Sequence, residues 1–92
     1  MNWIAVQPYY KVERKLNGLE MKTIRDDRIM YLYANKIVTA HREFEIEDVH
    51  DLSFRQMGGD EGILYLHTKQ GVFSYTLQGD TTAFIQSFRD LT

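Results

Sequence analysis

The chain has 92 residues, enough for one hydrophobic core and too few for two independently packed ones. Its composition, 43% hydrophobic with six Tyr, five Phe and one Trp, excludes an intrinsically disordered chain. Eleven Lys and Arg against 13 Asp and Glu give a net charge of −2, so the overall charge does not indicate nucleic acid or an anionic membrane as a partner.

Cysteine is absent, which excludes disulfides, a thiol nucleophile and every Cys-based metal site. No apolar run approaches the ~20 residues of a membrane span. The first eight residues have neither the basic start nor the length of a signal peptide. We therefore expect a cytoplasmic protein.

Turn signals separate short segments rich in Tyr, Val, Ile, Thr and Phe, which is typical of an antiparallel meander. We predict strands at residues 10–16, 19–25, 28–34, 37–43, 49–56, 63–69 and 72–78. Residues 3–7 can add an eighth segment at an edge, so residues 1–8 form an N-terminal edge segment that Pro8 separates from Tyr9.

Asn17-Gly18 is a two-residue hairpin signal that sets the first register. It places Lys15 opposite Glu20 and Glu13 opposite Lys22, two opposite-charge pairs on one face. The prediction is a hairpin whose register is set by its charges.

Two further turns set the registers of the later hairpins. Asn35-Lys36 would pair Tyr33 with Val38, but both faces of this hairpin are apolar, so its core face stays open. Gln70-Gly71 would pair Leu66 with Tyr75 and Leu64 with Leu77, which makes the strongest core candidate in the chain. A type I turn with a bulge at Gly71 would shift these pairings.

The end of the chain changes from strand to helix periodicity. Residues 44–49 alternate apolar and acidic side chains, and either a short strand end or a single helical turn fits them. Asp80 is a good N-cap for a helix over residues 81–91. The apolar stripe of that helix, Phe84, Ile85, Phe88 and Leu91, predicts that it docks on the sheet and plugs its open end.

Four stretches resemble the small bacterial pleckstrin-homology-like (PH-like) domains: residues 28–33, 45–49, 62–71 and 84–88. The resemblance covers residues 10–92. It implies about seven antiparallel strands in a PH-like barrel or sandwich, with one C-terminal amphipathic helix, all in a single domain. Lipid head-group binding is not carried over, because the loop Asn17-Gly18 lacks the family's basic cluster. The only Trp is Trp3, whereas PH domains place one in the C-terminal helix.

Residues 47–54, 64–71 and 75–77 also resemble, more weakly, the opening of LytTR-type DNA-binding domains. That family continues into a basic recognition segment, where this chain stops. Residues 41–62 carry two basic and seven acidic side chains, a charge of −5 that repels phosphate backbones. Nucleic acid is therefore not an expected partner.

The sequence holds no strong catalytic or metal-binding motif. His41, Glu45 and His50 could meet, but surface histidines fit these positions better than metal ligands do. The acidic residues of segment 43–51 fit a solvated edge, and residues 58–62 fit a strand connection, not a phosphate loop. We predict no catalytic residue, no metal and no cofactor.

The predicted function is a non-catalytic binding or assembly module that acts on a protein partner or associates with itself. Trp3, Tyr9 and Tyr10 are the possible protein contacts, with core or edge packing as the competing interpretation. The hypothesis is a homodimer formed through residues 3–10. The alternative is a small carrier of a ligand or lipid, or an enzyme of unknown class, although no small molecule is indicated and membrane lipid is not expected.

Overall fold

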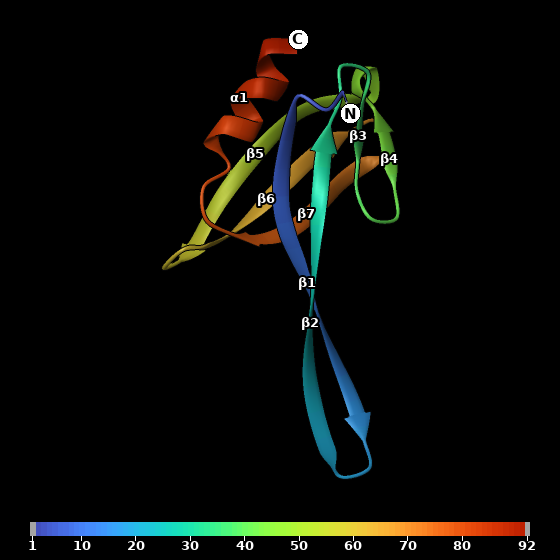
Figure 1. Cartoon of the computed structure of the whole chain (residues 1–92), viewed down its shortest axis with the longest axis vertical. Helices are drawn as coiled ribbons and strands as arrows, with labels where there is room; N and C mark the ends of the chain where they lie inside the picture. The colour runs from blue at the N-terminus through green and yellow to red at the C-terminus, as the bar shows by residue number, and fades with distance from the viewer. Residues whose placement is uncertain (1, 92) are drawn as a thin grey trace.

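Seven antiparallel strands and one C-terminal helix make up the computed structural model, which describes residues 2–91 (Figure 1). The predicted fold class, mainly β with a C-terminal helix, is confirmed. The elements in chain order are β1 (Ala5–Asn17), β2 (Glu20–Leu32), β3 (Lys36–Val38), β4 (Glu43–Glu45), a 3-10 turn (Ile46–Asp48), β5 (Val49–Gly58), β6 (Glu61–Thr68), β7 (Gly71–Gln78) and α1 (Thr82–Leu91).

The strands form one sheet in the order β4-β3-β2-β1-β7-β6-β5. Its two halves meet where β1 pairs with β7 at the single position Tyr10–Thr76. β4 and β5 lie at opposite edges of the sheet, which is not closed into a barrel. The closure that the PH-like resemblance implied is therefore absent from the described part of the chain.

β1 and β2 are each 13 residues long, longer than predicted. β2 runs unbroken where two strands, 19–25 and 28–34, were predicted, and the predicted strand 37–43 is instead divided between β3 and β4. Residues 44–49 form both a short strand and a helical turn.

The predicted break at Pro8 is wrong, because β1 continues through it, with Pro8 opposite Ile29. Asn17 and Glu20 close the β1–β2 turn, so hydrogen bonding to β2 falls on the odd-numbered residues of β1. Pro8 is even-numbered and its missing N–H is not needed there. Residues 5–8 are thus part of a long strand and not a separate edge segment.

Each predicted hairpin turn is displaced by one residue. The first turn is Gly18-Leu19, with Gly18 at φ 65° and no other residue of the turn at positive φ. This is the pattern of a type II′ turn, whereas type I′ needs positive φ at both central positions. Lys15 consequently lies opposite Lys22, and the two predicted opposite-charge pairs are wrong.

The later hairpins shift in the other direction. Tyr31, not Tyr33, pairs with Val38, and Leu66 pairs with Phe73 in place of Tyr75. Each shift moves the pairing by two positions, which leaves every side chain on its predicted face. The core face predicted for the β6–β7 hairpin is therefore confirmed, with Leu64, Leu66 and Leu77 fully buried.

The predicted docking of the helix on the core side of the sheet is confirmed, but the strands nearest to it are β1 and β5 and not those of the β6–β7 hairpin. Asp80 caps the helix by accepting a hydrogen bond from the Thr82 backbone N–H at 2.9 Å. Phe84, Ile85 and Phe88 are buried and join one core cluster with residues of β1, β2, β3, β4, β5, β6 and β7. Leu91, by contrast, stays partly exposed at the end of the stripe.

Candidate interaction surfaces

A two-stranded arm, residues 11–26 of β1 and β2, projects away from the rest of the domain (Figure 1). The register of the hairpin continues to Asn17–Glu20, whereas β7 meets β1 at Tyr10 and β3 meets β2 only at Tyr31 and Leu32. The radius of gyration is 14.6 Å, against about 12 Å for a compact chain of this length. The arm therefore makes the molecule elongated, with extents of 50 × 28 × 27 Å.

Both edges of the arm lack a third strand within the described residues. Because Asn17 and Glu20 close the turn, the backbone N–H and C=O groups of Thr23, Arg25 and the other odd-numbered residues of β2 point away from β1. Such unpaired edges are templates for pairing with another strand. A two-stranded ribbon is also only marginally stable alone in water.

The outer face of the arm, which is the side turned away from the core, has an apolar end. Leu16 lies on it directly opposite Met21, whereas Arg14, Thr23 and Arg25 share the rest of this face with Val12. Leu16 is 72% exposed and Met21 65%, and Leu19 at the tip is fully exposed. Contiguous exposed apolar side chains of this kind are typical of interaction sites.

The inner face of the arm, which continues the core side of β1 and β2, is charged. Its side chains are Lys11, Glu13, Lys15, Asn17, Glu20, Lys22, Ile24 and Asp26. Among the ion pairs of the described residues, only that of Arg28 with Asp26, at 2.7 Å, involves this face. The two lysines that lie opposite each other, Lys15 and Lys22, repel.

Arg25 fixes the base of the arm to the sheet. Its guanidinium lies 4.0 Å from the centre of the Tyr10 ring and donates hydrogen bonds to Asp27 at 2.9 Å and to Gln78 at 3.0 Å. Burial raises the pKa of the Tyr10 hydroxyl and nearby Glu61 adds to the rise, while Arg25 opposes it. These contacts hold the arm where β1 leaves β7.

A cleft of about 390 Å³ opens beside this base, between β1, β7 and the β3–β4 connection. Lys11, Arg28, His41 and Arg42 line it, and no Asp or Glu does. The hydrogen bonds that Arg28 donates to Asp26 hold the pKa of its guanidinium above the ordinary value. The side chains around the cleft can attract an anionic group.

Two of the three predicted contact residues are buried. Tyr9 lies in the core, its hydroxyl accepting a hydrogen bond from the Ala40 N–H at 3.1 Å, and Tyr10 lies beneath Arg25. In the single chain both tyrosines therefore pack against other residues, as their competing interpretation describes. Trp3 is 39% exposed, 6.5 Å from the ring of Tyr31, and its role as a protein contact stays a prediction.

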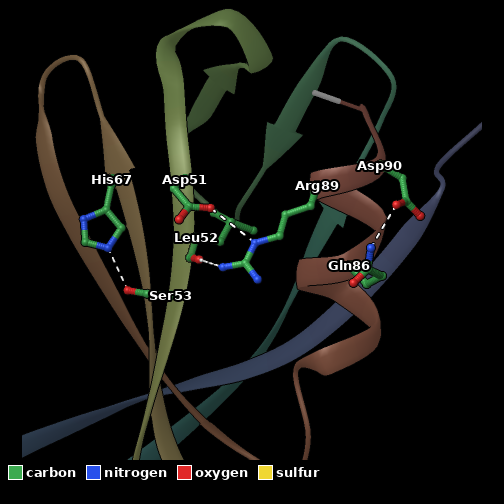
Figure 2. Close-up of polar contacts among 7 residues, drawn as sticks. All are labelled: Asp51, Leu52, Ser53, His67, Gln86, Arg89 and Asp90. Carbon is green, nitrogen blue, oxygen red and sulfur yellow. Dashed lines mark hydrogen bonds and ion pairs between the residues drawn. The ribbon is translucent and has the colours of Figure 1, made fainter.

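Ser53 and His67 form a hydrogen bond, and no carboxylate of the described residues completes a catalytic triad with them. Ser53 Oγ lies 2.7 Å from His67 Nε2, the two residues projecting from neighbouring strands β5 and β6 (Figure 2). Asp51 of β5 points instead toward Arg89 of α1, at 3.5 Å, as Figure 2 shows. Within residues 2–91, no three His, Asp or Glu side chains are grouped to hold a metal ion.

Sequence reasoning missed the arm. The predicted strands 19–25 and 28–34 left Asp26 and Asp27 between them, whereas β2 runs through both residues. A signal was nevertheless present, since neither Gly nor Pro occurs between Gly18 and the end of β2. A long uninterrupted strand was the interpretation that this absence favoured.

Comparison of the sequence with protein-family models finds no match. A search of curated proteins likewise finds no similar protein. Among the described residues, no helix has the length and apolar character needed to cross a membrane.

Proposed function

We propose that this protein is a non-catalytic assembly module that associates with itself through its arm. The observation that carries the proposal is the arm itself, a two-stranded ribbon with two unpaired edges and exposed apolar side chains, Leu16, Leu19 and Met21, at its end. All of the buried core residues lie in the body of the domain, outside the arm. A long ribbon left in solvent is useful when another chain completes it by strand addition.

Because Tyr9 and Tyr10 are buried, the proposal assigns self-association to the arm and not to residues 3–10. Deleting residues 1–8 would remove the start of β1, so it would not test association alone. Shortening the arm tests association without removing part of the core, because the arm contributes none of the buried core residues.

A shortened arm tests the proposal. Replacing residues 14–23 by Asn-Gly leaves Glu13 and Ile24, an opposed pair like Asn17 and Glu20, to close a two-residue turn. Sedimentation equilibrium should show concentration-dependent association of the intact chain and a monomer for the shortened one. Val72→Ser is the matched control, since it removes an exposed apolar side chain of β7 outside the arm and should leave association unchanged. An intact chain that stays monomeric at high micromolar concentration contradicts the proposal.

The relation to PH-like domains is also a proposal. The sequential antiparallel strands and the docked C-terminal helix support it, and the unclosed sheet and the lack of a matching family model do not. An experimentally determined structure with β4 and β5 brought together at one corner would support the relation further.

The cationic cleft favours a second candidate, a carrier of a small anionic ligand. Arg28 and Arg42, which both line the cleft, could hold a phosphate or carboxylate group. Thermal shift with inorganic phosphate and with nucleotides tests it, using Arg42→Gln as the comparison. A rise of several degrees that the variant loses would support the carrier. An unchanged melting temperature with all of these ligands would contradict the carrier hypothesis.

A further inference from the structure

We infer that two copies of the chain pair antiparallel along the open edge of β2, with Ile24 of each copy opposite Ile24 of the other. The inference rests on the proposed self-association and specifies the edge and the register. It follows from symmetry, from the charges on the arm and from the length of the open edge.

Symmetry first limits the registers. Two identical antiparallel neighbours in one sheet are related by a twofold axis perpendicular to that sheet, so one residue must lie opposite its own copy. Residues equally far from this centre on either side then lie opposite each other. Choosing the register therefore means choosing the central residue of β2.

Charge then selects the centre. Lys22, Arg25, Asp26, Asp27 or Arg28 at the centre would each lie opposite its own like charge. Thr23 at the centre would bring Glu20 opposite Asp26 of the other copy. Among residues 22–28, only Ile24 brings no like charges together.

With Ile24 at the centre, the charges are also complementary. Lys22 lies opposite Asp26 of the second copy, Glu20 lies opposite its Arg28, and symmetry repeats both pairs. Neither Lys22 nor Glu20 makes an ion pair within the described residues of its own chain. Asp26 accepts both hydrogen bonds from Arg28 on Oδ2, so its Oδ1 remains available to Lys22 of the second copy. On the same face, two Ile24 side chains meet; each is 43% exposed in the single chain.

The backbone fits this register. Thr23 and Arg25, whose N–H and C=O groups point away from β1, come opposite each other and can exchange hydrogen bonds between copies. The open edge ends at Met30, because Tyr31 pairs with Val38 of β3. The turn residues Gly18 and Leu19 of the second copy come opposite Met30 and Ile29, so its strand fills the edge and its turn ends where β3 begins.

The other edge of the arm is less suited. Along residues 11–17 of β1, the register with the longest overlap is centred on Arg14 and brings two arginines together. Centres at Glu13 or Lys15 also oppose like charges, and centres at Val12 or Leu16 overlap over only three residues before reaching Tyr10 or the turn.

Charge reversal tests the register. Lys22→Glu should raise the dissociation constant of the homodimer about 10-fold or more, because two attractive pairs become repulsive. The substitution does not weaken the arm itself, since the new carboxylate faces Lys15 of the same chain. Lys15→Glu is the matched control, with the same charge change on the same face but on the β1 edge, and its effect should stay within about threefold.

Complementation makes the test specific. Asp26→Lys should also weaken the homodimer, and mixing it with Lys22→Glu should restore a heterodimer, because each variant then supplies the charge that the other needs. Native mass spectrometry with one variant labelled with ¹⁵N counts the mixed species.

The outcomes separate the two proposals. Variants that self-associate like the unmodified chain, while the shortened arm abolishes association, overturn the register and leave the proposed function standing. A loss of association with Lys15→Glu as large as with Lys22→Glu overturns the choice of edge. An unmodified chain that remains monomeric overturns both.

Discussion

Phe88 is the position where the docking of α1 can be measured. Its side chain is 1% exposed and belongs to the core cluster that α1 forms with the sheet, together with Phe84 at 2%. Phe→Ala at such a buried site costs about 3–5 kcal/mol, from the lost transfer free energy and the cavity left behind. At roughly 0.05–0.15 kcal/mol per residue, a domain of this length has a total stability of about 5–14 kcal/mol. Phe88→Ala should therefore remove about a fifth or more of it.

Urea titration followed by tryptophan fluorescence or circular dichroism measures this loss. With a slope of about 1.5 kcal/mol per molar urea, the midpoint should fall by about 2–3 M. Gln86→Ala is the control, because Gln86 is exposed on the opposite side of the same helix and the change should stay within about 0.5 kcal/mol. A loss below about 1 kcal/mol for Phe88→Ala would mean that the helix is not docked as described.

Two further predictions concern Gly62 and Asp80. A Cβ at Gly62 would overlap the Phe54 ring and approach the Arg55 carbonyl oxygen to 3.0 Å, so Gly62→Ala should cost about 1–3 kcal/mol in urea titration; unchanged stability would show that the ring has room to move. Hydrogen bonds from Thr82 lower the pKa of Asp80 from 3.8, so its stabilising effect is present above pH 3.8 and is lost as the pH falls through the lower folded-state value. The stability difference between the unmodified chain and Asp80→Ala should shrink over that range, and a difference that persists at lower pH would contradict this cause.

The fold class could be predicted from the hydrophobic pattern. It depends on which face of a strand or helix each side chain occupies, and not on the exact register of the strands. The displaced turns of the hairpins moved pairings by two positions, so Leu64 and Leu66 kept their core face although their partners changed. The docked helix was predictable for the same reason, since Phe84 and Phe88 recur at helical spacing.

Turn geometry and strand length were not predictable in the same way. Whether Asn17-Gly18 or Gly18-Leu19 forms the turn depends on the φ angles of two residues, and both choices place a glycine in the turn. The arm depends on where β7 and β3 stop pairing with β1 and β2, which is a tertiary property. The arm as a candidate site could therefore be identified only from the structure. The register between two copies of β2 could be derived only once the β1–β2 register was known.

Amide hydrogen exchange measured by NMR at several protein concentrations tests the central claim most directly. If two arms pair along β2, the outward-pointing N–H groups of Thr23 and Arg25 become protected as the concentration rises, while those of Val12 and Arg14 on the β1 edge do not. The N–H of Lys22, which already faces β1, serves as the internal reference. Exchange at Thr23 and Arg25 that does not change with concentration, or protection that grows equally on both edges, would contradict pairing through β2.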